Sequence, residues 1–169
     1  MRLARLMPHP ETPSAFVDEI EVQLERDGLL LWLRYTIVGD PSAIAWPDLA
    51  GSGRADDLWR HTCCEAFVSA DDGYVEYNLS PSGLWASYRF DGPRMGMRAA
   101  DEAVAVLGMD SGFDPAALEA RIELPPGARR LGLSCVIEDR NGAFSYWALA
   151  HPSAKPDFHH PDSFVLELP

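Results

Sequence analysis

The chain has few basic residues and no long apolar run. Its 14 lysines and arginines stand against 26 acidic residues, a formal net charge of −12. A surface that follows the phosphates of nucleic acid or of an anionic membrane is therefore not expected. No apolar segment approaches the roughly 18 residues that cross a bilayer, and the N-terminal residues lack the apolar core of a signal peptide. These absences favour a cytoplasmic protein with neither a nucleic-acid nor a membrane partner.

Cysteine is also scarce. The three cysteines, two of them adjacent at Cys63 and Cys64, make no disulfide framework and are expected as free thiols. His61 stands close to this pair, but no third group that would activate a thiol nucleophile is visible in the sequence. A glycine-rich phosphate loop is missing too, because the segment 51–53 neither follows a predicted strand nor begins a helix.

A sustained helical period is the third absence. Short runs rich in β-branched and aromatic residues alternate with turns of Gly, Pro, Asp and Asn. We therefore predict a single domain, residues 1–169, with an all-β fold of the antiparallel β-sandwich type, because two sheets can each bury one face. An irregular N-terminal arm and a long loop over residues 43–57 are expected. The predicted strands cover residues 16–24, 29–38, 64–68, 75–79, 85–90, 103–109, 118–124, 131–138, 143–150 and 164–168.

The stretch from Leu58 to Phe90 is central to this prediction. Two alternating runs flank Asp71-Asp72-Gly73, and Pro81-Ser82-Gly83 leads into a third, which predicts a three-stranded antiparallel meander. If both loops hold an even number of residues, alternation separates a core face from a mixed face. The core face would hold Cys64, Ala66, Val68, Val75, Tyr77, Leu79, Ala86, Tyr88 and Phe90. The mixed face would hold Glu65, Phe67, Glu76, Asn78, Trp85, Ser87 and Arg89.

A late hairpin around Asp139-Arg140-Asn141-Gly142 follows the same rule. With a four-residue loop, its polar face would carry Trp147 together with Ser134, Val136 and Ser145. Its apolar face would carry Leu133, Cys135, Ile137, Phe144, Tyr146 and Ala148. A second tryptophan is therefore expected outside the core.

The mixed face carries the groups of a sugar-binding site. Indole rings stack on the C–H face of a sugar, while carboxylates, amides and guanidinium groups form hydrogen bonds with its hydroxyls. Trp85 and Trp147 would stack in this way. The pair Glu65 and Glu76 also suggests a glycoside hydrolase, whose two carboxyls lie about 5 to 9 Å apart. Ligand contact and hydrolysis both remain open for this pair.

The histidines near the C-terminus suggest a metal as a further alternative. His151, His159 and His160 occur close to Asp157 and Asp162, a set of side chains that can hold a divalent ion. Adjacent histidines on an extended chain point in opposite directions, so at most one of the last two would join the first. A metal-dependent hydrolase is the resulting alternative.

Methionines suggest a haem protein as another alternative. Met95 and Met97 follow Arg94, and a methionine with a histidine can ligate haem iron. The sequence has no Cys-x-x-Cys-His attachment motif. Methionines at the start of a strand also serve commonly as core filler.

Several long motifs resemble one protein family. They are LWRHTCCEAFV, YVEYNLSPSGLWASYRF, GPRMGM and SYWALAHPSAKPDFHHPDSFVLEL. In these the chain resembles the bacterial DOMON-like proteins related to family 9 carbohydrate-binding modules. The resemblance implies a jelly-roll-type β-sandwich with a ligand site on one face or at the strand ends, and relatives in the wider superfamily bind sugars or haem. Residues that match the family's motifs are Glu65, Glu76, Asn78, Trp85, Trp147, His151, Lys155, Asp157 and His159.

We predict a binding domain without chemistry of its own, whose partner is a small polar ligand, a saccharide or sugar derivative. No catalytic residue and no metal ligand is assigned, haem is the alternative cofactor, and the oligomeric state stays open. The stacking residues are the two tryptophans, and the loop histidines with the lysine would form a rim. The predicted ligand-binding residues are Glu65, Glu76, Asn78, Trp85, Arg89, Arg94, Trp147, His151, Lys155 and His159.

Overall fold

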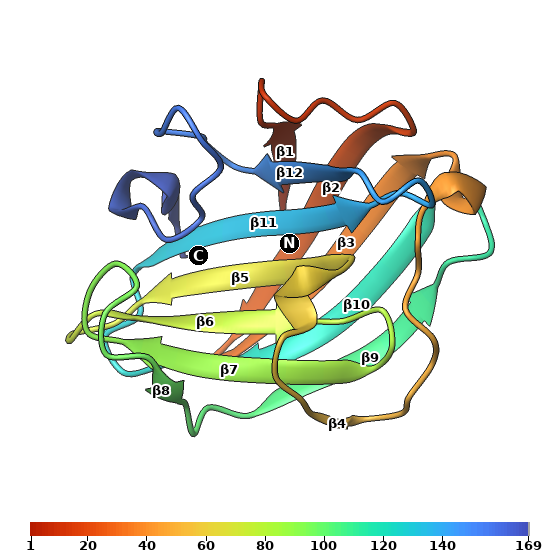
Figure 1. Ribbon diagram of the computed structural model, residues 1–169. Coiled ribbons are helices and arrows are strands. Elements are labelled where there is room, and N and C mark those ends of the chain that lie inside the picture. The colour runs from red at the N-terminus through yellow and green to blue at the C-terminus, as the bar shows by residue number, and fades with distance from the viewer. Residues whose placement is uncertain (169) are drawn as a thin grey trace.

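The computed structural model describes residues 1–168, and these are almost entirely β-structure (Figure 1). Over this part of the chain the only helices are single 3-10 turns, as the lack of helical periodicity predicts. None of them has the length or apolarity to span a bilayer. The helical turns are η1 (Pro41–Ala43), η2 (Leu58–Arg60) and η3 (Pro161–Ser163). The strands are β1 (Arg2–Pro8), β2 (Val17–Asp27), β3 (Leu30–Gly39), β4 (Gly53–Arg54), β5 (Cys63–Ser69), β6 (Tyr74–Leu79), β7 (Leu84–Phe90), β8 (Arg98–Ala99), β9 (Val104–Asp110), β10 (Ala116–Glu123), β11 (Arg130–Glu138), β12 (Phe144–Ala148) and β13 (Leu166–Glu167).

The strands form one curled sheet, a half-barrel, in the order β4-β7-β6-β5-β11-β12-β1-β2-β3-β10-β9. All-β structure is confirmed, but a sandwich of two separate sheets is not. The reason is β1, which sequence alone assigned to an irregular arm. Residues 2–6 of this strand pair with β2, and Met7 and Pro8 pair with β12. One strand thus joins the front of the molecule to the back. All neighbours are antiparallel except β4 and β7.

The main core lies between front strands β7, β6, β5 and β11 and back strands β2, β3, β10 and β9 (Figure 1). Aliphatic side chains fill it, and burial of such side chains is the principal source of stability. Two tyrosine hydroxyls cross it to reach backbone carbonyls. Tyr35 donates to the carbonyl of Glu65 at 2.7 Å, and Tyr77 donates to that of Glu123. These bonds satisfy polar groups that would otherwise be buried without partners.

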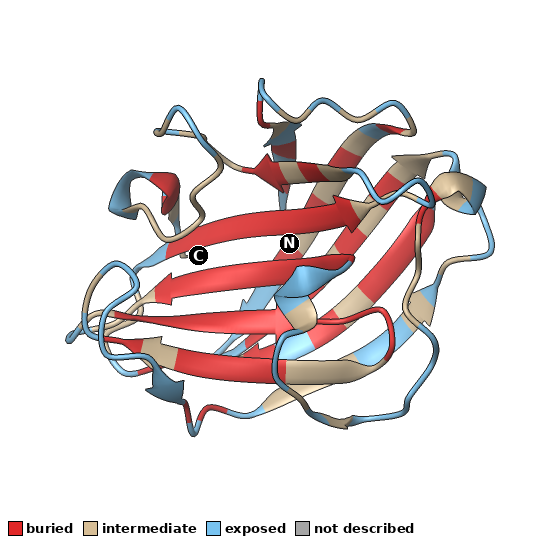
Figure 2. Ribbon diagram, viewed as in Figure 1, coloured by how far each residue is buried: buried red, intermediate tan, exposed pale blue. Residues whose placement is uncertain are grey.

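The outer face of the front strands is buried as well (Figure 2). Every residue of β6, and all of β5 except Ser69, is buried. The turn η2, the 91–97 loop and the C-terminal loop over residues 151–164 cover it. A second apolar cluster lies there, composed of Phe67, Tyr74, Ala86, Tyr88, Phe90 and Phe164, with Leu58 and Phe158 packed against it.

The predicted meander is confirmed, but its third strand has the opposite facing. Glu65 pairs with Asn78 and Phe67 with Glu76, as an even first loop requires. Leu79, however, pairs with Trp85, so the second loop is odd. The turn is Pro81-Ser82-Gly83, with Gly83 in the left-handed region at φ +94°, and three-residue hairpin loops commonly end in such a residue. Trp85, Ser87 and Arg89 therefore leave the predicted mixed face, and Ala86, Tyr88 and Phe90 join it.

The late hairpin shows the same correction. Its loop is Arg140-Asn141-Gly142, again three residues, with Gly142 at φ +80°. Cys135 therefore pairs with Trp147, and Val136 pairs with Tyr146. The odd loop places Trp147 in the main core, only 2% exposed. Tyr146 takes the outward position expected for the tryptophan.

The reversed facing predicts which tryptophan supports the fold. Trp147→Ala should lower the free energy of unfolding by about 3–5 kcal/mol, because it leaves a large cavity in a well-packed core. Trp59→Ala, at a position 45% exposed, should change it by no more than about 1 kcal/mol. Urea denaturation of both variants measures the difference. Equal losses in the two variants would contradict the assigned register.

Candidate functional site

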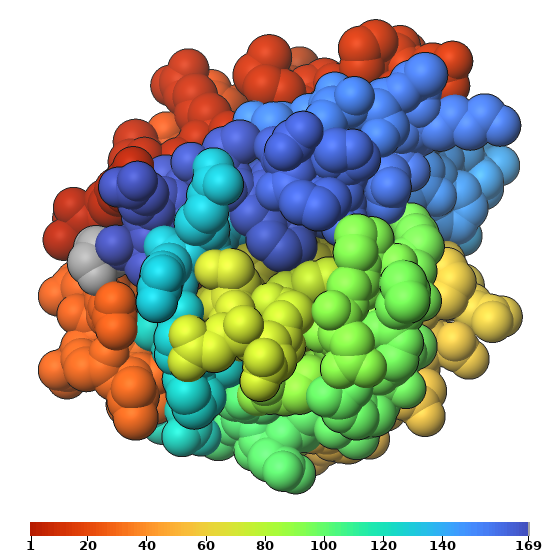
Figure 3. All heavy atoms as spheres, turned by 90° about the vertical axis from the view of Figure 1, so that its left-hand side faces the viewer, coloured from red at the N-terminus to blue at the C-terminus, as the bar shows by residue number. Residues whose placement is uncertain are grey.

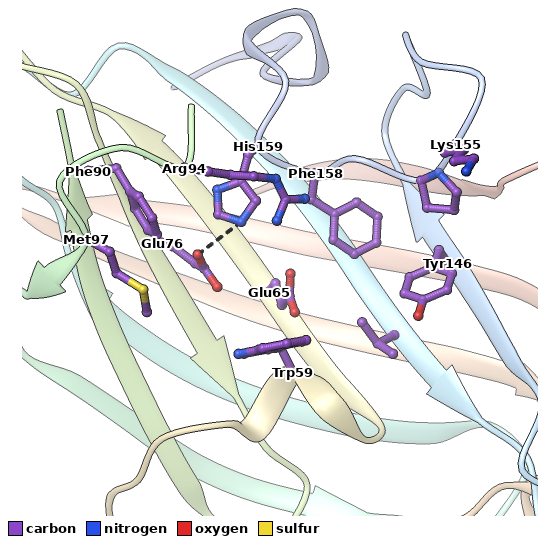
Figure 4. A pocket seen from close by; sticks show the side chains of 12 residues that line it. Trp59, Glu65, Glu76, Phe90, Arg94, Met97, Tyr146, Lys155, Phe158 and His159 are labelled. Carbon is purple, nitrogen blue, oxygen red and sulfur yellow. Dashed lines mark ion pairs between the residues drawn. The ribbon is translucent and has the colours of Figure 1, made fainter. Parts of the chain in front are cut away.

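A pocket of about 500 Å³ lies on the outer face of the front strands (Figure 4). Its floor comes from β5, β6, β7, β11 and β12, and its rim from η2 and from the loops over residues 91–97 and 151–160. The floor is regular sheet, so its side chains are fixed by the strand register. The lining residues are Trp59, Glu65, Glu76, Phe90, Arg94, Met97, Val136, Tyr146, Lys155, Pro156, Phe158 and His159.

Glu65 is the more isolated of two carboxyls on this floor. Its side chain projects from β5 into the pocket (Figure 4), although the residue is only 3% exposed. One oxygen, Oε2, accepts a hydrogen bond from Ser134 at 3.4 Å. Burial, with nearby Glu76 and Cys135 adding to it, raises the pKa of Glu65 well above its usual value. Burial therefore favours the protonated form of Glu65, which can both donate and accept a hydrogen bond.

Glu76 lies diagonally across from Glu65 on the same face, since Glu65 pairs with Asn78. Diagonal neighbours on adjacent strands have β-carbons about 7 Å apart. Asn78 donates to Oε1 of Glu76 at 2.9 Å, and Nε2 of His159 lies 3.5 Å from Oε2. Burial raises the pKa of Glu76 to about 7, with the Asn78 bond and Arg94 opposing it. Burial thus shifts both carboxyls toward the protonated form.

His159 closes the pocket from the C-terminal loop. Its Nδ1 lies 2.6 Å from the hydroxyl of Tyr74, and its ring packs at right angles against Phe67 and Phe90. Burial, assisted by the positive charge of Arg94, lowers the pKa of His159 to about 4. The imidazole is therefore neutral at pH 7, and both of its ring nitrogens already have neighbours within the protein.

Two cations stand at the rim. The Arg94 side chain is exposed and donates to Asp157 at 3.1 Å, while its backbone N–H donates to the Tyr74 hydroxyl. This contact joins the 91–97 loop to the C-terminal loop. In Figure 3 the blue C-terminal segment lies against the green segment that contains residue 94. Lys155 is exposed on the side of the pocket near Tyr146 and forms no ion pair within residues 1–168 (Figure 4).

Half of the predicted ligand-binding residues line this pocket, namely Glu65, Glu76, Arg94, Lys155 and His159. Asn78 lies on the same face, fully buried and outside the pocket lining, and donates a hydrogen bond to Glu76. The other four lie elsewhere. Trp85 stacks under the guanidinium of Arg54 at 4.8 Å, Arg89 pairs with Glu102, Trp147 is in the core, and Nε2 of His151 lies 2.7 Å from the carbonyl of Met7.

The aromatic walls were not predicted. Phe90 and Tyr146 had been assigned to the core by the even-loop assumption, and Phe158 and Trp59 lie in segments without alternation. Both reversals trace to a glycine at the third position of a turn. That signal is present in the sequence, since Pro81 suits the first turn position and Gly83 the left-handed third. The two loop aromatics carry no comparable local signal.

The histidines do not form a metal site. His151 faces His9, with ring centroids 4.9 Å apart, His159 faces the pocket, and His160 caps η3 by accepting from the N–H of Asp162. Among residues 1–168, no group of three or more His, Cys, Asp or Glu side chains is arranged to hold a metal ion. The metal-dependent alternative therefore has no ligand set in the described chain.

The cysteines are free thiols, as expected, and all three are buried. Burial raises the pKa of Cys63 and of Cys64 well above the usual value for a thiol. Neither is available as a thiolate near neutrality, so a cysteine nucleophile is not part of this site.

Comparison of the chain with protein-family models, with curated proteins and with solved structures finds no match. The pocket is therefore interpreted from its own chemistry.

Glu76→Gln should remove a pH-dependent loss of stability. The pKa of Glu76 rises from its usual 4.5 to about 7 in the native protein, so the stability contributed by the protonated form decreases as pH rises between these values. The free energy of unfolding of the variant, minus that of the wild type, should therefore increase by about 3 kcal/mol from pH 4 to pH 8. Urea denaturation at both pH values measures it.

Glu119→Gln is the control for this experiment, because Glu119 is a partly exposed residue of β10 paired with Arg34. It should show no comparable change with pH. If the free energy of unfolding of Glu76→Gln, minus that of the wild type, is the same at pH 4 and pH 8, the buried environment assigned to this carboxyl is wrong.

Proposed function

We propose that the pocket binds a small polar ligand, a saccharide or sugar derivative, without performing chemistry on it. The observation that carries the proposal is the combination of aromatic walls with hydrogen-bonding carboxyls on a fixed floor. Pockets that are mainly apolar with a few convergent polar groups are typical ligand sites. The resemblance to the bacterial DOMON-like proteins supports a binding role. The free thiols favour a reducing, cytoplasmic setting.

Each part of the pocket suits one side of a sugar. Trp59 lies across one wall with its ring toward the cavity (Figure 4), and an indole is a good surface for the C–H face of a pyranose. Glu65 and Glu76 would bind hydroxyls, since a carboxyl accepts hydrogen bonds in either form and also donates one when it is protonated. The bonds from Asn78 and Ser134 hold these carboxyls in place before a ligand arrives, and such preorganisation increases affinity.

The residues do not fit haem. Met97 and His159 do line the same pocket, and a methionine with a histidine is the donor set considered for haem from the sequence. However, Nδ1 of His159 contacts the Tyr74 hydroxyl and Nε2 faces Glu76, so ligation of iron would break one of these contacts. The floor beneath a macrocycle would also be two carboxyl groups, which disfavour an apolar ring. Haem is therefore not proposed.

Glycoside hydrolysis is the second candidate, because the carboxyl pair shares one floor. The raised pKa of Glu65 suits a general acid, and Glu76, whose pKa is about 7, suits a base or nucleophile. Release of nitrophenol from a panel of nitrophenyl glycosides tests it. Turnover that is lost in both Glu65→Gln and Glu76→Gln would establish hydrolysis, and lack of release across the panel would exclude it for those sugars.

Titration calorimetry against mono- and disaccharides and nucleotide sugars tests the binding proposal. We expect at least one ligand with a dissociation constant below millimolar. Trp59→Ala should weaken the binding of that ligand by about tenfold, because a stacking surface of this kind contributes roughly 1 to 1.5 kcal/mol to the binding free energy.

Trp85→Ala is the matched control. Trp85 is also partly exposed, but it lies on the other face of β7 and outside the pocket. Binding should therefore be unchanged in this variant. The proposal would be wrong if no saccharide bound more tightly than millimolar, or if the two tryptophan variants lost equal affinity.

A further inference from the structure

We propose that the ligand carries a positively charged nitrogen, an ammonium group that lies on the pocket floor between Glu65 and Glu76. This inference rests on the proposed binding function and narrows its ligand to an amine-bearing compound, such as an amino sugar. Four observations support it: two carboxyls without cationic partners, a free carboxyl oxygen, aromatic walls, and the charge balance of the rim.

Neither carboxyl has a cationic partner inside the protein. Within the described chain, no lysine or arginine forms an ion pair with Glu65 or Glu76, and the one nearby imidazole, His159, is neutral at pH 7. Buried acidic groups are normally paired, because an unpaired charge in a poorly solvated site is costly. Glu65 and Glu76 lie at the bottom of an open cavity. A bound ligand can therefore supply the positive charge that would pair with them.

The carboxyl of Glu65 also has an unused oxygen. Ser134 donates to Oε2, and within residues 1–168 no donor reaches Oε1. The side chain is nine-tenths buried or more and points into the cavity (Figure 4). An ammonium group has three N–H donors and no acceptor. It can therefore donate to both carboxyls at once. A hydroxyl has one donor and can donate to only one of them.

The walls suit a cation as well. Trp59, Phe90, Tyr146 and Phe158 all contribute to the lining, and the face of an aromatic ring attracts a cation that lies within about 6 Å of its centre. Aromatic groups beside buried carboxyls are the usual surroundings of bound ammonium groups. A neutral sugar would use the same rings only for stacking.

The other charged groups around the floor do not cancel the negative charge that the two carboxyls can carry. Arg94, on the 91–97 loop, is paired with Asp157 of the C-terminal loop, and its positive charge opposes the rise in the pKa of both carboxyls without forming an ion pair with either. Lys155 stands exposed at the rim, so solvent screens it. The net charge of −12 attracts cations at long range. The titratable and charged groups that face the carboxyls are Arg94, Tyr74, Tyr88, Cys63, Cys135, Tyr146, Lys155, Asp157 and His159.

Matched ligands test the inference. Calorimetric titration at pH 7 would compare three hexoses (glucose, galactose and mannose) with their 2-amino and 2-acetamido derivatives. The acetamido derivative keeps the nitrogen but removes its charge. We expect at least one amino sugar to bind about tenfold or more tightly than both of its neutral counterparts, the gain expected for a desolvated charge contact.

Substitutions of the two carboxyls test whether they cause the higher affinity for the amino sugar. Glu65→Gln and Glu76→Gln keep the size of the side chain but cannot ionise beside an ammonium group, so each should reduce the preference for the amino sugar to about threefold or less. Glu119→Gln removes the same charge from a residue outside the pocket and should leave the preference unchanged. Circular dichroism and thermal melts confirm that each variant is folded. If the glutamine variants keep the full preference, the inference is wrong.

Proton release provides a second measurement that does not depend on the variants. A bound ammonium group should ionise the carboxyls, which then release protons to the buffer. The binding enthalpy at pH 6 should therefore change with the ionisation enthalpy of the buffer. Binding of a neutral sugar should release fewer protons. Ethanolamine, a small primary amine that carries the same –NH3⁺ group, separates the two proposals: if ethanolamine binds and no sugar does, the ammonium inference stands and the saccharide function falls. If neutral and amino sugars bind equally, the function stands and the inference falls.

Discussion

Strands β5 and β6 are buried on both faces, and the rest of the structure depends on how the pleat divides their side chains. Residues that alternate along a strand face opposite sides without exception. One set, including Tyr77 and Leu79, completes the core between front and back strands. The other set, including Glu65 and Glu76, forms the floor of the pocket. The same two strands therefore supply both the stability of the fold and the polar groups of the site.

Much of the fold follows from sequence, and the two errors in strand facing have one physical source. The all-β character, the three-stranded meander and the late hairpin could each be predicted from alternation and turn residues. The facing of β7 and β12 could not, because it depends on whether a loop holds an odd or an even number of residues. Both errors occurred at three-residue turns that end in glycine, Gly83 and Gly142. Counting those glycines as the last turn residue would have placed Trp147 in the core and Tyr146 outside it.

The site was less predictable than the fold. Glu65 and Glu76 could be placed on one face because the first loop is even, and that placement agrees with the structure. Trp59, Met97 and Phe158 belong to segments that cross the sheet, and nothing local in the sequence indicates where such segments come to lie. The single sheet was equally hidden, since β1 changes partner between Leu6 and Met7 without a break in its alternation.

The roof of the pocket has a consequence for how fast ligands exchange. It consists of loops joined across the opening by the exposed pair Arg94 and Asp157 and by contacts to the Tyr74 hydroxyl. Exposed pairs of this kind contribute about 0 to 1 kcal/mol and are screened by salt, so little free energy fixes the loops at the rim of the pocket. The floor, by contrast, is central sheet. Access should be quick and nearly the same for all ligands small enough to enter, and selectivity would then be expressed as residence time on the carboxyls.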